Sequence, residues 1–112
     1  MGPFEKLSDA TFEEEVERAE GIVAVDFWAA WCAPCRISAK VLEEVAPAFE
    51  ERVRVRTMDT DLNPATATRY GIRSLPTLLF FRDGKVIDQL VGAVPREILR
   101  KRFEAVASPG AS

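Results

Sequence analysis

The two cysteines of this chain, Cys32 and Cys35, lie three residues apart in the segment FWAAWCAPCR at positions 27–36. On a helix, residues at this spacing have Cβ atoms about 5 to 6 Å apart, which a disulfide bond can span after a modest adjustment. Paired thiols of this kind support thiol–disulfide exchange, in which one thiolate attacks a foreign disulfide and the second resolves the mixed disulfide. The pair therefore indicates a redox reaction in which one chain supplies both electrons.

The elements around the pair favour Cys32 as the attacking thiol. Residues 22–28 form a nearly unbroken apolar, β-branched run, which predicts a strand covered on both faces. An amphipathic helix is predicted from Ala33 onward, so Cys32 lies at its N-terminus. The unpaired amides and the helix dipole there favour a thiolate and can lower a cysteine pKa from about 8.5 into the range of roughly 3.5 to 7.5. Cys35, one turn later and pointing toward the sheet, is expected to act second.

Two other uses of the pair fit the sequence less well. A zinc site usually needs four Cys or His ligands, whereas this chain has two cysteines and no histidine, so we expect no metal. A purely structural disulfide that closes so short a loop would add little stability, and it would lie in a reducing cytoplasm. Pro34 suits a helical first turn, where an amide hydrogen would be unpaired in any case, and it stiffens the loop.

Length and composition indicate one compact domain. The 112 residues suffice for a single hydrophobic core, and we expect a domain at 1–107 followed by a short flexible tail at 108–112.

The net charge of −3 and the scattered basic residues predict no nucleic-acid surface, and no pattern predicts a dimer, so we expect a monomer. No apolar run approaches the roughly 20 residues of a membrane helix, and the N-terminus lacks a secretion-signal pattern, so we expect a cytoplasmic protein. The absence of histidine excludes Cys/His and Ser/His/Asp nucleophile pairs.

The rest of the chain alternates helices and strands, which indicates an α/β fold with a mixed sheet between helices. Helices are predicted at 11–19, at 33–51, at 64–70 and from Pro95, and strands at 22–28, 53–59, 77–81 and 86–91. Thr11 and Glu14 form a capping-box pattern at the start of the first helix. Asp83 and Gly84 signal a tight turn, so the last two strands are expected to form an antiparallel hairpin. Pro47 has no amide hydrogen, which predicts either a kink in the second helix or a short break with a new turn.

Three segments together resemble the thioredoxin family, and the resemblance covers nearly the whole chain. The segments are VAVDFWAAWCAPCR, DTDLNPATATRYGIRSLPTLLFFRDGKV and QLVGA. They are similar to the family's active-site strand and helix, its proline loop with the elements beside it, and the glycine that ends its hairpin. The resemblance implies the thioredoxin fold, a central mixed five-stranded sheet flanked by four helices. It also implies no cofactor, reduction of disulfides in client proteins, and an NADPH-dependent thioredoxin reductase as electron donor.

The resemblance also implies roles for single residues. Cys32 matches the family's attacking thiol, Cys35 its resolving thiol, and Asp26 the buried aspartate that handles the proton of the resolving cysteine. The residues themselves agree, because Asp26 interrupts an apolar strand on the face that it shares with Ala24 and Trp28. A buried carboxyl without a partner is costly to ionise, so we expect the pKa of Asp26 to be raised.

Substrate contact is expected at a small apolar rim around the cysteines. Pro76 matches the family's cis proline, which helps to align an extended client backbone. We expect this rim to consist of Trp31, Pro34, Leu75, Pro76, Gly92 and Ala93. Trp28 is expected to pack beneath the rim as support.

The sequence departs from the family pattern at three positions. Ala33 replaces the glycine usual between the first cysteine and the proline, which restricts the backbone where the helix begins. Lys40 replaces a helix-kinking proline, so we expect a straight first half of the helix with the bend displaced toward Pro47. Thr57 replaces a lysine often found near the buried aspartate. Without this cation Asp26 should be harder to ionise, although a hydrogen bond from the Thr57 hydroxyl would offset part of the loss.

Two alternative functions stay open at this point. The leading function is a general disulfide reductase, and the first alternative is a disulfide oxidant or isomerase. Ala33 and Pro34 favour the reductase, because oxidising relatives usually carry a histidine between the cysteines. In a third interpretation, the apolar rim docks a partner protein and the thiols are incidental.

Overall fold

The computed structural model describes residues 3–108, so most of the expected tail at 108–112 lies outside the described residues. The strands are β1 (Glu5–Lys6), β2 (Ile22–Trp28), β3 (Val53–Asp59), β4 (Thr77–Arg82) and β5 (Lys85–Val91). The helices are η1 (Glu13–Glu17), α1 (Ala33–Val45), η2 (Ala46–Phe49), α2 (Pro64–Arg69) and α3 (Arg96–Ala107). Of these, η1 is a short π-helix and η2 a 3₁₀ helix.

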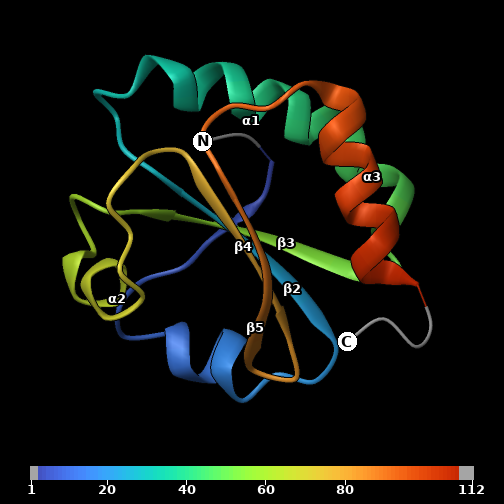
Figure 1. Ribbon diagram of the computed structural model, residues 1–112. Coiled ribbons are helices and arrows are strands. Elements are labelled where there is room, and N and C mark those ends of the chain that lie inside the picture. Colours follow the sequence, from blue (N-terminus) through green and yellow to red (C-terminus); the bar gives the residue numbers. More distant parts are fainter. Residues whose placement is uncertain (1–2, 109–112) are drawn as a thin grey trace.

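The five strands form one mixed sheet in the order β1-β3-β2-β4-β5 (Figure 1). Strand β2 is central, parallel to β3 on one side and antiparallel to β4 on the other. The chain leaves β2 directly toward α1, so the two cysteines lie at the carboxyl end of the central strand. In the part of the chain that the structure describes, no helix has the length and apolar character needed to cross a membrane.

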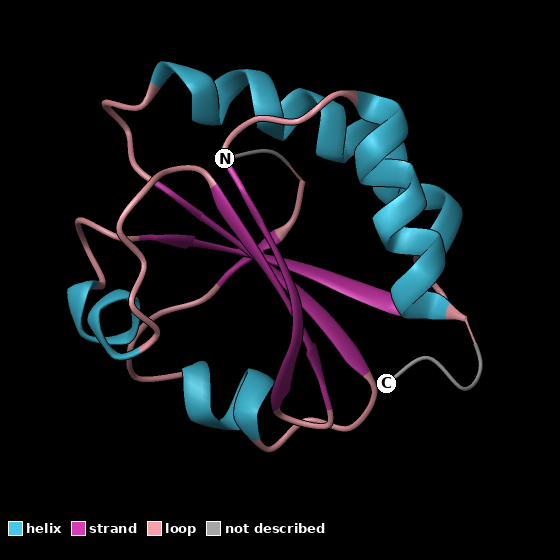
Figure 2. Cartoon of the chain, viewed as in Figure 1, coloured by secondary structure: helices cyan, strands magenta, loops and turns pink. Residues whose placement is uncertain are grey.

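Helices cover both faces of the sheet, as Figure 2 shows, with α1 and α3 on one face and η1 and α2 on the other. Successive side chains of β2 point to opposite faces of the sheet, so the strand contributes residues to both layers. Ala24 packs with the residues of α1 and α3, whereas Val23 and Val25 pack in the opposite layer with Phe12 and Val16. The predicted α/β architecture, a mixed five-stranded sheet between helices, is therefore confirmed.

Strand positions agree closely with the sequence analysis. The predicted bounds of β2 and β3 are confirmed, and β4 and β5 are each one residue longer at the turn. Asp83 and Gly84 form this turn with positive φ angles of 50° and 83°, which suits an Asp-Gly hairpin. The turn is tied to the start of β2, because the Gly21 amide donates to the Asp83 carboxylate at 2.8 Å and the Asp83 amide donates to the Gly21 carbonyl at 2.9 Å.

The N-terminal region differs from the prediction. The first helix is confined to Glu13–Glu17, and its expected cap at Thr11 is wrong. The chain already turns at Ser8, whose amide donates to the Thr11 hydroxyl at 2.9 Å while the Thr11 amide donates to the Ser8 hydroxyl at 3.2 Å. Strand β1 was not predicted from the pattern, because its two residues are exposed and charged and show no apolar alternation.

Helix α1 runs without interruption through Lys40 and ends at Val45, two residues before Pro47. The 3₁₀ helix η2 then begins at Ala46, with Pro47 in its first turn. A helix unbroken at Lys40 and a new turn at Pro47 are thus confirmed, whereas a single helix reaching residue 51 is wrong. Proline fits this position because the amides of a first turn need no partner within the helix.

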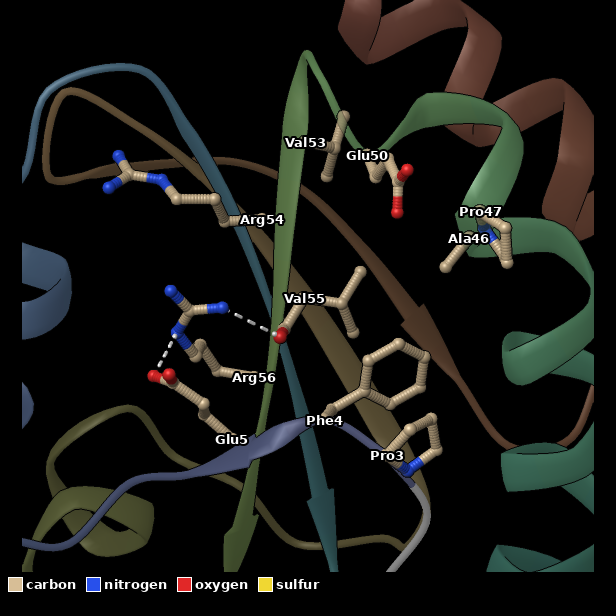
Figure 3. Close-up of a pocket in the computed structure, with 10 residues that line it drawn as sticks. All are labelled: Pro3, Phe4, Glu5, Ala46, Pro47, Glu50, Val53, Arg54, Val55 and Arg56. Carbon is tan, nitrogen blue, oxygen red and sulfur yellow. Dashed lines mark hydrogen bonds and ion pairs between the residues drawn. The ribbon is translucent and has the colours of Figure 1, made fainter.

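A cavity of about 220 Å³ lies between the N-terminal segment, η2 and the start of β3. Figure 3 shows Phe4 beside Val55 in this cavity, and the Arg56 guanidinium between Glu5 and the Val55 carbonyl oxygen. Val53 pairs with Ile22 at the beginning of β2, whereas the cysteines follow the end of β2. The cavity therefore lies along the first half of β3, and neither cysteine lines it.

Gly84 is expected to tolerate no side chain. At its φ of 83°, an added Cβ would collide with the backbone carbonyl oxygen of Glu17, so Gly84→Ala should lower the free energy of unfolding by about 2 to 4 kcal/mol. Gly71→Ala is the matched control, because Gly71 has a φ of 67° but open space around it. The control should lose only about 1 kcal/mol. Urea denaturation measures both, and equal losses would contradict the role of close packing at Gly84.

Candidate active site

The two cysteines lie where β2 passes into α1. Cys32 is the N-cap of α1, with extended backbone angles of −91° and 102°, and Pro34 occupies the first turn. A disulfide joins Cys32 to Cys35, whose Cα atoms are 5.3 Å apart. The Cys35 amide donates a hydrogen bond to the Cys32 sulfur at 3.2 Å, so this sulfur takes the place of a capping side chain.

The environment of the two sulfurs is unequal. The Cys32 residue is 3% exposed and the Cys35 residue is fully buried, in agreement with the expectation that Cys35 lies deeper. The Cys32 sulfur also lies at the positive end of the helix dipole and accepts the amide hydrogen bond described above. Both effects stabilise negative charge, so the geometry favours a thiolate at Cys32 over one at Cys35.

Asp26 is buried on β2, two residues before the strand ends. It is 4% exposed and lies on the sheet face that α1 and α3 cover. Burial in these apolar surroundings raises the pKa of Asp26 to about 7, because the charged form loses its hydration. The predicted burial and raised pKa are both confirmed. A carboxyl with this pKa can accept and release a proton near neutral pH.

Thr57 lies directly opposite Asp26 in the pairing of β2 with β3. Its side chain is buried, but its hydroxyl oxygen has no hydrogen-bond partner. The expected hydrogen bond to Asp26 is therefore not formed.

A small cavity of about 10 Å³ adjoins Asp26. Pro76 and Gly92 line it, and so does Ser38 of α1. Ser38 is not among the residues predicted for the site. A signal was present, because Ser38 lies three residues after Cys35 and four before Leu42, which makes it a hydroxyl within the apolar stripe of the helix.

The residues predicted for the rim divide into two groups. The Leu75–Pro76 bond is cis, as the resemblance implied, and the Gly92 amide donates to the Pro76 carbonyl at 2.7 Å. Leu75 packs against the apolar cluster that contains both cysteines, as does Trp28. The structure therefore brings these residues together at the disulfide and at the Asp26 cavity.

The second group lies at the surface. Trp31 is 69% exposed, and Ala33, Pro34 and Ala93 are exposed as well. Trp28, in contrast, is half-buried, and its indole nitrogen is buried without a hydrogen-bond partner. Trp28 thus packs against the cysteine cluster, whereas Trp31 lies at the surface. Within residues 3–108 no three or more potential ligands of the types His, Cys, Asp and Glu come together to hold a metal ion.

A disulfide at the start of a helix, a buried carboxyl on the preceding strand and a cis proline define a thiol–disulfide oxidoreductase. Comparison with known proteins gives the family: the thioredoxin family model matches residues 3–105, and the chain belongs to the thioredoxin family. It is a thioredoxin-type protein-disulfide reductase with a CxxC pair at Cys32 and Cys35.

Bacterial relatives match over most of their length. The chain is 47% identical to the thioredoxin of Synechocystis sp. over 104 residues, which is 93% of this chain and 97% of the relative. It is 50% identical to thioredoxin 1 of Synechococcus elongatus over 98 residues, or 88% and 92% of the two chains. The thioredoxin of Rhodospirillum rubrum is 47% identical over 100 residues, or 89% and 96%.

The raised pKa of Asp26 makes stability depend on pH. Between its ordinary value of 3.8 and about 7, the unfolded chain is ionised at Asp26 while the folded chain holds a proton. The contribution of Asp26 to stability is therefore greatest below pH 4 and falls by roughly 4 kcal/mol as the pH rises to about 7. Asp26→Asn should remove this loss, so that the variant is more stable than the parent at pH 8 and similar to it at pH 4.

Urea denaturation at a series of pH values measures this effect. Asp61→Asn is the matched control, because Asp61 is exposed. Its stability curve should follow that of the parent protein. Parallel curves for the parent and Asp26→Asn would contradict the burial of an ionisable carboxyl.

Proposed function

We propose that Cys32 attacks the disulfide of a client protein and that Cys35 resolves the mixed disulfide. The observation that carries this assignment is the position of the Cys32 sulfur, which caps α1 and accepts the Cys35 amide at 3.2 Å. Full burial of Cys35 keeps a client disulfide from reaching it first. The product is a reduced client and the Cys32–Cys35 disulfide.

Asp26 is the group that we propose takes the proton of Cys35. A resolving thiol must lose its proton before it can attack, and an unshifted thiol is only slightly ionised at neutral pH. The carboxyl of Asp26 has a pKa of about 7, which suits a base at that pH. Thr57 offers it no hydrogen bond, so hydration of the carboxyl has a large influence on its charge.

Client proteins are proposed to dock on the rim formed by Trp31, Pro34, Leu75, Pro76, Gly92 and Ala93. The exposed indole of Trp31 supports this surface, since a large aromatic side chain at 69% exposure is available to a partner. Leu75 and Pro76 lie beside the disulfide and beside Asp26 respectively. An extended client segment at Pro76 would therefore present its disulfide to Cys32.

Each turnover oxidises the chain, so a donor must return two electrons. We propose an NADPH-dependent thioredoxin reductase for this step, by analogy with the family. The setting that suits the reaction is the reducing cytoplasm, and the proposed working unit is a monomeric domain at 1–107.

Substitution of each cysteine separates the two roles. Cys35→Ser should trap a covalent complex with a disulfide client such as insulin, because the mixed disulfide cannot be resolved. Cys32→Ser should trap little, because the remaining thiol is buried. Non-reducing gels and intact mass measure the complex, and turbidity of insulin with dithiothreitol measures turnover. Trapping by Cys32→Ser alone would reverse the assignment.

Removal of the proposed base should change the pH profile. In the parent protein, the rate of mixed-disulfide resolution should rise through a midpoint near pH 7, set by Asp26. Asp26→Asn should lose this midpoint and resolve at least about tenfold more slowly at pH 7.5. Single-turnover kinetics with a fluorescent disulfide peptide measure both, and an unchanged profile would exclude Asp26 as the base.

A further inference from the structure

The small cavity beside Asp26 has the dimensions of a single water site. Its volume of about 10 Å³ is close to the minimum that one buried water needs. It lies between β2, α1, α3 and the segment around Gly92, and its lining residues are Asp26, Ser38, Leu42, Pro76, Leu78, Leu90, Gly92, Val94 and Leu99. Gly92 and Val94 are half-buried, so the cavity reaches from the buried carboxyl to the surface at the rim.

Only two of the lining residues have polar side chains. A buried water usually needs two to four polar partners, and Asp26 supplies one. The hydroxyl of Ser38 supplies the second, whereas the other lining side chains are aliphatic. The Pro76 carbonyl already accepts the Gly92 amide. Without Ser38 the cavity would offer a water molecule one polar side chain and an otherwise apolar wall.

Among the described residues, no charged group besides Asp26 lines this cavity. Thr57 faces Asp26 from β3 and Leu78 from β4. From the two helices over this face, α1 contributes Ser38 and Leu42 to the lining and α3 contributes Leu99. No cation among the described residues lines this cavity, so a hydrating water is the interaction that can stabilise the Asp26 carboxylate there.

We propose that Ser38 is a positioning residue: its hydroxyl and the Asp26 carboxyl together hold one water molecule in this cavity, and this water carries the proton of Asp26 to solvent at the rim. The proposal rests on the role of Asp26 proposed above.

Resolution of the mixed disulfide conserves protons and electrons. The S–H bond of Cys35 breaks and its proton moves to Asp26, while the Cys35 sulfur forms a bond to the Cys32 sulfur. The bond from Cys32 to the client breaks, and the client sulfur leaves with the electron pair and takes a proton from solvent. Asp26 then releases its proton through the water at Ser38. The chain is oxidised by two electrons and the client is reduced by two.

Ser38→Ala tests the proposal. Alanine favours helix, so the variant should fold. Loss of the hydroxyl should raise the pKa of Asp26 by about 0.5 units or more, since the carboxylate loses its hydrating water. The midpoint of the resolution rate should move upward equally, with a rate about threefold lower at pH 6. NMR titration of the Asp26 carboxyl carbon and single-turnover kinetics measure the two shifts.

Two further variants make the result specific. Ser38→Thr keeps a hydroxyl and should restore both midpoints. Val41→Ala is the matched control, because Val41 is half-buried on the same helix but lies outside the cavity lining, and it should move neither midpoint. In the parent protein, nuclear Overhauser contacts between water and the methyl groups of Leu42 or Leu78 should be present, and Ser38→Ala should lose them.

The outcomes are distinguishable from failure of the proposed function. Unchanged midpoints in Ser38→Ala, while Asp26→Asn abolishes the pH dependence, would overturn the role of Ser38 and leave that of Asp26 intact. Absence of the water contacts in the parent protein would also overturn it. An unchanged pH profile in Asp26→Asn would instead remove the base on which both proposals rest.

Discussion

Strand β2 has a hydrogen-bonded neighbour on each side and a helical layer over each face, so five consecutive residues in its middle are buried. Two features of the site follow from this enclosure. The Asp26 carboxyl loses most of its hydration, which raises its pKa to about 7. The chain leaves β2 at the carboxyl edge of the sheet, where α1 begins at Ala33. There the Cys35 amide of the first turn donates a hydrogen bond to the sulfur of Cys32.

The parts of the fold that the sequence predicts well are those where local pattern and tertiary burial agree. Strand β2 is enclosed by the core, so its apolar run marks its full length, whereas β3 is marked by the alternation of buried Val53 and Val55 with two arginines. Strand β1 is held by pairing with β3 rather than by its own side chains, so its sequence has no apolar alternation that predicts a strand. The predicted cap at Thr11 is wrong because Ser8, three residues earlier, also has a hydroxyl that can accept a backbone amide. The local sequence pattern does not show at which of the two residues the chain turns.

The same division holds within the site. The cysteines and Asp26 were found because a thiol pair and a buried acid are unusual at any position in a sequence. Ser38 was not, because its neighbours in the cavity come from distant parts of the chain and only the folded sheet brings them together. Thr57 shows the opposite error: pairing places it beside Asp26 as expected, but its buried hydroxyl has no hydrogen-bond partner.

The short β1 edge has a consequence for the behaviour of the protein at high concentration. An uncovered sheet edge is a template for strand pairing between chains, and proteins avoid this with short, charged edge strands. Here Glu5 and Lys6 form the whole edge strand, and the Arg56 guanidinium donates to the Val55 carbonyl at 3.1 Å while pairing with Glu5 (Figure 3). One of the acceptors beside that edge is thus occupied by the chain itself. This arrangement disfavours edge-to-edge pairing of chains at the β1 side of the sheet, whereas the opposite edge is the seven-residue strand β5.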